Sequence, residues 1–222
     1  SKSTSVLIKN VIGRNRIINI EPYASDIHDL GKWIYLPGNN IRVLPIKTNH
    51  APHVKKLGFK FRLFRGQAKE LDNYTHELDK TKGRKWKQGQ SFAFLIDFLE
   101  KEKITFRAYI QTSASESKGG FIHPIIKNEN GIDLAIIASA SFHTVENYPK
   151  DLLDNIEPSN ILIAHWEDFF IPYSTETVTT VRGTNLNEFL EELNCAFSWH
   201  KNGTQRVFIP QPGVEIKFFL KE

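Results

Sequence analysis

A short apolar run that ends abruptly in polar and aromatic residues is the clearest pattern in this chain. Residues 161–164 are all apolar, and His165 follows them directly. Upstream, residues 151–156 have the apolar spacing of a short helix, and Pro158 would end that helix. The pattern therefore predicts a helix, a turn and a buried strand that delivers a histidine to its own end.

Apolar and polar residues alternate along several other segments, as they do in strands with one buried face. Residues 133–138 are almost wholly apolar, which is typical of a strand buried on both faces. Pro45 places the strand 41–47 near a sheet edge or a bulge. The other predicted strands are 59–64, 91–98 and 104–110, with a hairpin connection at 100–103, and the predicted helices are 149–156 and 186–197. These elements predict an α/β or α+β protein with a layered sheet.

The polar stretch from residue 67 to residue 88 predicts an excursion over the surface, which we expect to form a cover or lid. Within it, residues 80–87 form the one dense basic run and include Trp86. Basic residues around an aromatic ring can bind phosphate or an anionic surface. A solvated loop is the plainer alternative. A nucleic-acid partner therefore rests on this run alone.

Composition favours one globular domain over residues 1–222. The chain is 40% hydrophobic and 12% aromatic, which suits a substantial core. Lys and Arg total 29 against 25 for Asp and Glu, so the net charge is only +4. The sequence has no apolar run long enough to span a membrane. We expect a soluble protein, with the cytoplasm favoured as its compartment, and the sequence does not indicate its oligomeric state.

Cysteine and serine residues give little sign of nucleophilic chemistry. Cys195 is the only cysteine, so an intrachain disulfide is excluded. Leu190 and Leu193 lie at helical spacing around it, which predicts a buried thiol rather than a nucleophile. Ser113 and Ser115 lack the Gly-x-Ser-x-Gly surroundings of a serine nucleophile, so we expect them to form hydrogen bonds within a loop.

Six segments carry strand-like sequence with polar residues at or near their ends: residues 43–50, 91–96, 106–112, 133–137, 161–169 and 207–217. In this order they resemble the core segments of the metallo-β-lactamase-fold hydrolases. The resemblance implies an α/β fold of the four-layer αβ/βα sandwich type, which holds one or two zinc ions at the edge between its sheets. In that family, zinc lowers the pKa of its bound water to about 7, and the hydroxide attacks an ester, lactone, amide or phosphodiester.

The resemblance also assigns metal ligands by position. His50 matches a histidine that ends a strand, and His165 matches the last metal-binding histidine of the family. Thr112 falls where relatives carry an aspartate that bridges two ions. Because a neutral hydroxyl cannot supply that anionic bridge, one zinc ion is implied more readily than two, and Thr112 remains as a substrate contact.

Three further residues near these positions are candidates for the site. His53 and Trp166 are candidate substrate contacts, with a surface loop and core packing as their respective structural alternatives. Asp168 is the candidate catalytic base, because carboxylates commonly orient or assist metal-bound histidines. Its structural alternative is to cap the element that follows.

The family's main signature, a His-x-His-x-Asp-His cluster, is not present in this sequence, and we interpret His28 and Asp29 as a surface turn. The chain also contains no methionine and opens at Ser1. The predicted sandwich therefore lacks its N-terminal segment, which either precedes Ser1 or has been lost. The first case predicts a zinc-dependent hydrolase of a small-molecule substrate. The second predicts a non-catalytic relative that acts as a binding or interaction scaffold.

Overall fold

The computed structural model describes most of the chain. The described residues are 16–51, 54–56, 59–61, 90–115, 118–168, 171, 179–181, 183–197, 206–211 and 213–218. The predicted excursion at 67–88, its basic run at 80–87, and His53 lie outside these residues.

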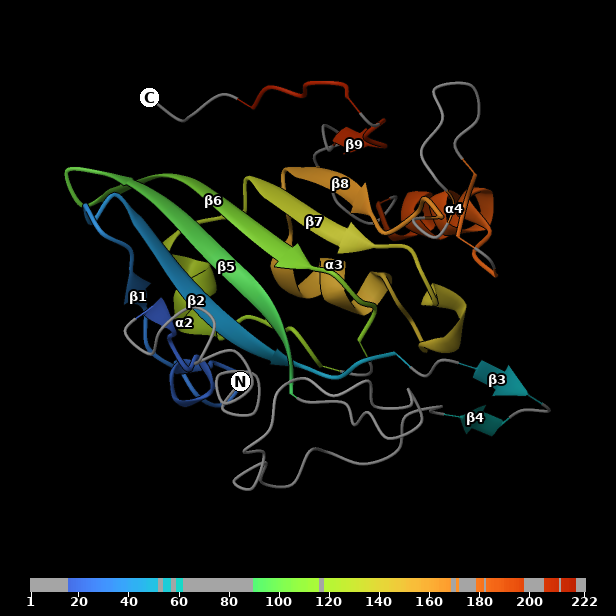
Figure 1. Cartoon of the computed structure of the whole chain (residues 1–222), viewed down its shortest axis with the longest axis horizontal. Coiled ribbons are helices and arrows are strands. Elements are labelled where there is room, and N and C mark those ends of the chain that lie inside the picture. Colours follow the sequence, from blue (N-terminus) through green and yellow to red (C-terminus); the bar gives the residue numbers. More distant parts are fainter. Residues whose placement is uncertain are drawn as a thin grey trace.

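A seven-stranded mixed sheet forms the centre of the fold (Figure 1). Its order is β1 (Ile34–Tyr35), β2 (Ile41–Thr48), β5 (Ser91–Glu100), β6 (Lys103–Gln111), β7 (Leu134–Ala138), β8 (Asn160–Ala164) and β9 (Arg206–Phe208). The strands from β1 to β6 pair antiparallel, whereas β6, β7, β8 and β9 pair parallel. A separate hairpin joins β3 (Val54–Lys56) to β4 (Phe59–Phe61).

Helices connect the parallel strands, because a parallel pair needs a crossover that returns the chain to the same end of the sheet. Helix α2 (Pro124–Glu129) lies between β6 and β7, and α3 (Lys150–Ile156) lies between β7 and β8. Helix α4 (Leu186–Phe197) comes after β8, and two short 3-10 turns, η2 (Glu21–Tyr23) and η4 (Phe142–Thr144), complete the described helical elements. The predicted α/β class is confirmed, and so is the predicted succession of helix, turn and strand before His165.

The helices pack on one face of the sheet and form the main core. In Figure 1, α2 and α3 lie behind the strands. The core combines inward side chains of the sheet with apolar side chains of all three helices. Its fully buried members include Leu44, Leu95, Ile137 and Ile161 from the strands and Leu153 and Phe189 from the helices.

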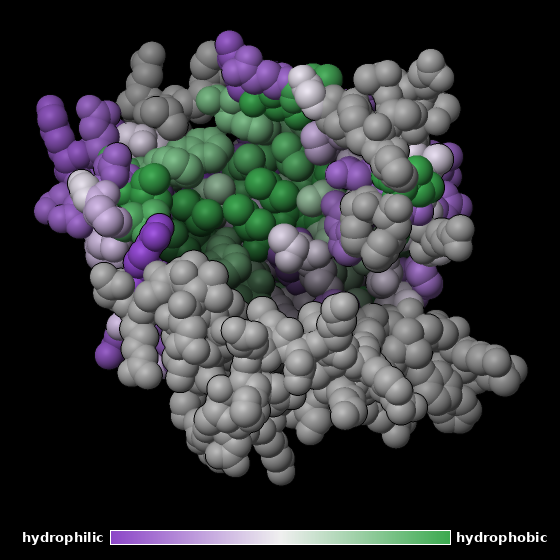
Figure 2. Space-filling view, viewed as in Figure 1, coloured by the Kyte–Doolittle hydropathy of each residue, from purple (hydrophilic) through white to green (hydrophobic). Residues whose placement is uncertain are grey.

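The opposite face of the sheet is also apolar. Alternation along the strands puts Ile96, Phe106, Ile136 and Leu162 on this face, where they form a second cluster. Phe218, from the C-terminal residues, packs against it, with its ring centroid 6.3 Å from that of Phe106. Figure 2 shows the hydrophobic surface that these side chains create across the sheet. The prediction that β7 is buried on both faces is confirmed for four of its five residues, and Ile136 is half-buried.

Local sequence explains two details of the sheet. The β5–β6 hairpin turns through Lys101 and Glu102, which both have positive φ, as the tight hairpin turns that suit twisted strands require. Strand β1 pairs only with residues 42 and 43 of β2, so Pro45 lies beyond the end of the edge strand. The predictions of a hairpin and of a near-edge Pro45 are both confirmed.

The prediction that the thiol of Cys195 is buried is wrong, since this residue is exposed on α4. The buried side chains of α4 are Phe189, Leu193 and Ala196, which follow one another at helical spacing. Cys195 comes directly before Ala196, and so lies about 100° away around the helix. The sequence pattern placed the buried stripe slightly too far around the helix.

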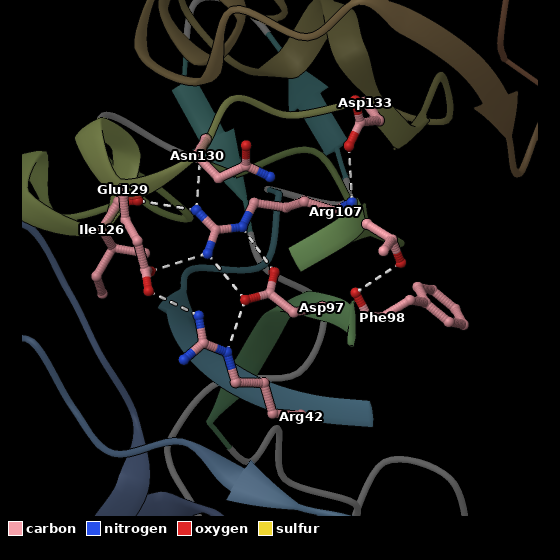
Figure 3. Close-up of polar contacts among 9 residues, drawn as sticks. Arg42, Asp97, Phe98, Arg107, Ile126, Glu129, Asn130 and Asp133 are labelled. Carbon is pink, nitrogen blue, oxygen red and sulfur yellow. Dashed lines mark hydrogen bonds and ion pairs between the residues drawn. The ribbon is translucent and has the colours of Figure 1, made fainter. Parts of the chain in front are cut away.

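A buried ion pair joins the middle of β5 to the middle of β6 (Figure 3). Arg107 donates from Nε to Asp97 Oδ1 at 2.6 Å and from Nη2 to Asp97 Oδ2 at 2.8 Å, and both side chains are fully buried. Arg42 of β2 adds a third charge-assisted hydrogen bond to Asp97 Oδ2, also at 2.8 Å. Two guanidinium groups therefore share one carboxylate under the helix layer.

The same arginine also holds α2 against the sheet. Arg107 Nη1 donates to the carbonyl oxygens of Ile126 and Asn130, each at 2.9 Å. Its Nη2 donates to Glu129 Oε2 at 3.0 Å. These acceptors lie at and just beyond the C-terminal end of α2, where carbonyl groups lack helical partners and a cation is favourable.

Trp33 closes the network on the side of β1. Its ring centroid lies 4.1 Å from the guanidinium carbon of Arg42 and 5.7 Å from that of Arg107. An aromatic face attracts a cation most strongly where water is excluded. The two arginines are therefore surrounded by the carboxylates of Asp97 and Glu129, by carbonyl oxygens at the end of α2 and by the ring of Trp33.

We predict that acid weakens the fold partly through Glu129. Burial acts to raise its pKa, but hydrogen bonds from Arg42 and Arg107 outweigh burial and hold the pKa below the usual value of a glutamate. A lowered pKa contributes stability above the unfolded-state pKa of about 4.3, and this contribution is lost as pH falls through the lower folded-state pKa. Urea unfolding at several pH values should therefore show that the free energy of unfolding falls less steeply with decreasing pH for Glu129→Gln than for the parent chain. The exposed control Glu146→Gln should follow the parent, and an unchanged slope in Glu129→Gln would refute this role.

Candidate functional site

Several strand ends meet at one edge of the sheet. Because β2 and β6 are both antiparallel to β5, they run in the same direction, and β7 and β8 run parallel to β6. The carboxyl ends of these four strands therefore lie along one edge, which we call the carboxyl edge. In open α/β sheets, ligands bind at this end of the parallel strands.

His165 stands on the carboxyl edge directly after β8, as the sequence predicts. Its backbone has a φ of 55°, in the left-handed region that non-glycine residues rarely adopt. The carbonyl of Ala164, just before it, accepts a hydrogen bond from the amide of Ser139 at 3.1 Å. The end of β7 thus fixes the backbone that presents His165.

His50 stands on the same edge after β2. Its Nδ1 lies 2.8 Å from the carbonyl oxygen of Ala51, and the neighbouring Asn49 amide donates to Ser115 Oγ at 2.9 Å. That bond ties the segment after β2 to the loop after β6. Strands β5, β6 and β7 lie between β2 and β8, so four strand spacings, about 19 Å in all, separate the two strands. The convergence of His50 and His165 on one ion remains a prediction.

Thr112 and the serine residues that follow it occupy the loop after β6. Thr112 is exposed at the strand end, and its role as a substrate contact remains a prediction. Ser113 Oγ donates to the carbonyl of Ala114, and Ser115 accepts the bond from Asn49. The expectation that these serines form loop hydrogen bonds is confirmed.

Trp166 and Asp168 lie on a short antiparallel stem beyond His165. The Val181 amide donates to the Trp166 carbonyl at 2.9 Å, and the Asp168 amide donates to the Thr179 carbonyl at 2.8 Å. The side chain of Trp166 is 6% exposed and belongs to the main core, as its structural alternative predicts. The catalytic role of Asp168 and the substrate contact of Trp166 remain predictions.

Tyr109, Gln111 and Gly120 form a close contact beneath the carboxyl edge. The Tyr109 hydroxyl donates a shared hydrogen bond to Gln111 Oε1 at 2.7 Å and to the Gly120 carbonyl at 2.8 Å. Burial raises the pKa of Tyr109 well above its usual value, so the hydroxyl keeps its proton. Burial also raises the pKa of Tyr148, whose hydroxyl donates to the Ala138 carbonyl at the end of β7.

Sequence reasoning missed two polar residues of the carboxyl edge, Gln111 and Ser139. Both are almost completely buried, at 1% and 0% exposed. Gln111 Nε2, Ser139 Oγ and Trp166 Nε1 are buried polar atoms without a hydrogen-bond partner in the described structure. The only signal for these residues in the sequence was a polar residue at the end of an apolar run. That pattern by itself predicts the start of a loop rather than a buried polar side chain.

The remaining histidine prediction concerns His28 and Asp29, which form a surface turn as expected. Both residues are exposed, and their amides donate to Asp26 Oδ1 at 2.9 and 3.0 Å.

The described residues do not by themselves complete a zinc site. A catalytic zinc needs three protein ligands and an open position. Within the described ranges, no group of three or more His, Cys, Asp or Glu side chains is placed to hold a metal. His50 and His165 are the right donor type on the right edge, so the fit to zinc is partial.

No protein-family model, curated protein or solved structure matches this chain. No helix in the described part of the chain has the length and hydropathy that crossing a membrane would need.

We predict that Gly120→Ala destabilises the protein. A Cβ atom at this position would lie 2.5 Å from the Tyr109 hydroxyl and 2.9 Å from Gln111 Oε1, and the backbone φ is +83°. Overpacking and left-handed strain together should lower the free energy of unfolding by about 2–4 kcal/mol, measured by urea denaturation. Gly131→Ala is the matched control, since its Cβ would meet nothing within 4 Å. Equal stability of the two variants would contradict this packing account.

Proposed function

We propose that this chain is a metal-dependent hydrolase of the metallo-β-lactamase fold, with its substrate site on the carboxyl edge. The proposed substrates are small molecules with an ester, lactone, amide or phosphodiester bond. The observation that carries the proposal is the position of His165 at the end of β8 on the carboxyl edge. His50 follows β2 on the same edge but four strand spacings away, so a shared ion requires the segments after β2 and β8 to bridge that distance. The resemblance of the ordered core segments to that family supports it further.

The backbone at His165 adds a second line of support. Left-handed backbone at a non-glycine residue is uncommon and tends to occur where function requires a particular side-chain direction. Here the strain lies at the residue that the resemblance assigns to the metal, and the amide of Ser139 holds the preceding carbonyl. A rigid strand end of this kind suits a metal ligand.

The apolar outer face of the sheet fits the proposed sandwich. Parallel strands are normally covered on both faces, and two sheets pack about 10 Å apart through apolar side chains. The outer cluster around Phe106 and Leu162 has the chemistry that a second sheet would bury. We therefore propose that the four-layer arrangement is completed by a second apolar sheet on this face.

The second candidate function is a non-catalytic binding or interaction scaffold with the same fold. The specific observation in its favour is that no group of three metal-binding side chains occurs among the described residues. The two candidates differ in metal content. A nucleic-acid substrate rests only on residues 80–87, which lie outside the described residues.

Zinc binding should separate these candidates. The full chain, purified without chelator, is titrated with zinc and compared with His165→Asn and His50→Ala, and its hydrolysis of p-nitrophenyl acetate and bis(p-nitrophenyl) phosphate is measured. Asparagine tolerates left-handed backbone, so His165→Asn removes the imidazole with little added strain. We expect each variant to lose zinc affinity by at least about tenfold, since even changes to outer-shell partners cost 10–100-fold. Chelator should abolish hydrolysis and added zinc should restore it.

The control is His28→Ala, which removes an exposed turn histidine and should leave zinc binding unchanged. Zinc binding that is equally tight in His165→Asn and His28→Ala would refute the assigned ligand. Zinc binding without hydrolysis of either ester would favour the scaffold.

A further inference from the structure

Tyr148 reaches from the loop after β7 back to the end of that strand. Its hydroxyl donates to the carbonyl oxygen of Ala138 at 2.8 Å, and the residue is only 6% exposed. Ala138 is the last residue of β7 and pairs with Ala164, the last residue of β8. The hydroxyl therefore acts on the strand end beside the one that carries His165.

The carbonyl that Tyr148 binds belongs to the same peptide group as the amide of Ser139. A peptide group is planar, so a hydrogen bond to its oxygen also restrains the direction of its N–H. That N–H donates to the carbonyl oxygen of Ala164 at 3.1 Å. Hydrogen bonds in series polarise and strengthen one another. Two such bonds therefore join Tyr148 to the peptide group between Ala164 and His165.

This last peptide group helps to set the φ angle of His165. The angle is 55°, in the left-handed region, which is unfavourable for a residue with a Cβ atom. The chain after His165 is fixed, because Trp166 lies in the main core and its carbonyl accepts a hydrogen bond from Val181. His165 can therefore leave the left-handed region only if the preceding peptide group turns. Such a turn would break the hydrogen bond from Ser139.

The ring that carries the hydroxyl is itself held by two phenylalanines. The ring centroid of Tyr148 lies 6.3 Å from that of Phe189 in α4, in a stacked arrangement. Phe142 packs against the same Phe189 ring, with the centroids 5.2 Å apart. All three residues belong to the main core. Burial raises the pKa of Tyr148, so this fixed hydroxyl keeps its proton and remains a donor.

We propose that Tyr148 is a positioning residue for His165, which it holds in the left-handed conformation through the peptide group between Ala138 and Ser139. The consequence for zinc rests on the proposed function. A restrained backbone gives the imidazole one direction, which strengthens a metal ligand. Groups that orient a ligand in this way typically contribute 10–100-fold to metal affinity.

The variant Tyr148→Phe tests this role, because it keeps the ring and removes only the hydroxyl. NMR spectra of the isotope-labelled full chain are recorded with chelator present. The Cα chemical shift of His165 reports its backbone conformation, and we expect it to move away from the left-handed value. The Ser139 amide should exchange with solvent about tenfold faster, because its peptide group has lost one hydrogen bond. In a separate titration, zinc affinity should fall at least about tenfold.

Tyr109→Phe is the matched control. It also removes a fully buried hydroxyl, which donates to Gln111 and to the Gly120 carbonyl, so it should lower the melting temperature by a similar amount. It leaves the peptide group between Ala138 and Ser139 untouched. We therefore expect this variant to keep the His165 chemical shift, the Ser139 exchange rate and the zinc affinity of the parent chain.

Each contrary result has a distinct meaning. An unchanged His165 chemical shift in Tyr148→Phe overturns the positioning role, and so does an equal change in Tyr109→Phe, which a general loss of stability would produce. If Tyr148→Phe does not fold, the parent chain decides: the Ser139 amide should be strongly protected, and exchange at the rate of an exposed amide overturns the role.

The same measurements separate this role from the hydrolase. A His165 chemical shift that depends on Tyr148, in a protein that binds no zinc, keeps the positioning role and overturns the hydrolase. Zinc binding that requires His165 but is equally tight in Tyr148→Phe keeps the hydrolase and overturns the positioning role.

Discussion

The buried pair of Arg107 and Asp97 is the interaction on which the arrangement of this fold depends. Two fully buried charges are costly to remove from water, and they are tolerated only when each lone pair and proton finds a partner. Here Asp97 accepts from both Arg107 and Arg42, and Arg107 also donates to the carbonyls of Ile126 and Asn130. One arginine thus specifies how β5, β6 and α2 fit together.

The rest of the sheet follows from that placement. With α2 held against β6, the crossover to β7 runs parallel, and α3 repeats the arrangement for β8. Parallel strands bring their carboxyl ends to a common edge, where backbone hydrogen bonding gives way to side-chain chemistry. His50 and His165 lie at that edge. So do the residues that carry three of the four buried polar atoms without a hydrogen-bond partner among the described residues. The buried Asp97–Arg107 network and the candidate site at the carboxyl edge are therefore separate regions of the same sheet.

Sequence periodicity predicted the elements well, because alternation and apolar runs report directly on which faces are buried. The strand before His165, the helix before it and the β5–β6 hairpin were all predictable in this way. The Asp97–Arg107 pair was not, because a charged residue within an alternating strand resembles a solvent-facing position until its cross-strand partner is known. The burial of Gln111 and Ser139 was not predictable for a related reason, because burial at a strand end depends on which loops pack over it. For Cys195 the error was the opposite one: the predicted buried face of α4 was rotated slightly around the helix, so an exposed residue was predicted to be buried.

A double-mutant cycle on the buried pair tests the central claim most directly. The free energy of unfolding is measured for Asp97→Leu, Arg107→Met and the double variant. If Arg107 and Asp97 compensate each other's burial, each single change should cost about 3–5 kcal/mol by leaving a buried charge without its main partner. The double change should then cost less than the sum by about 1–3 kcal/mol. Strict additivity of the two single costs would contradict the account.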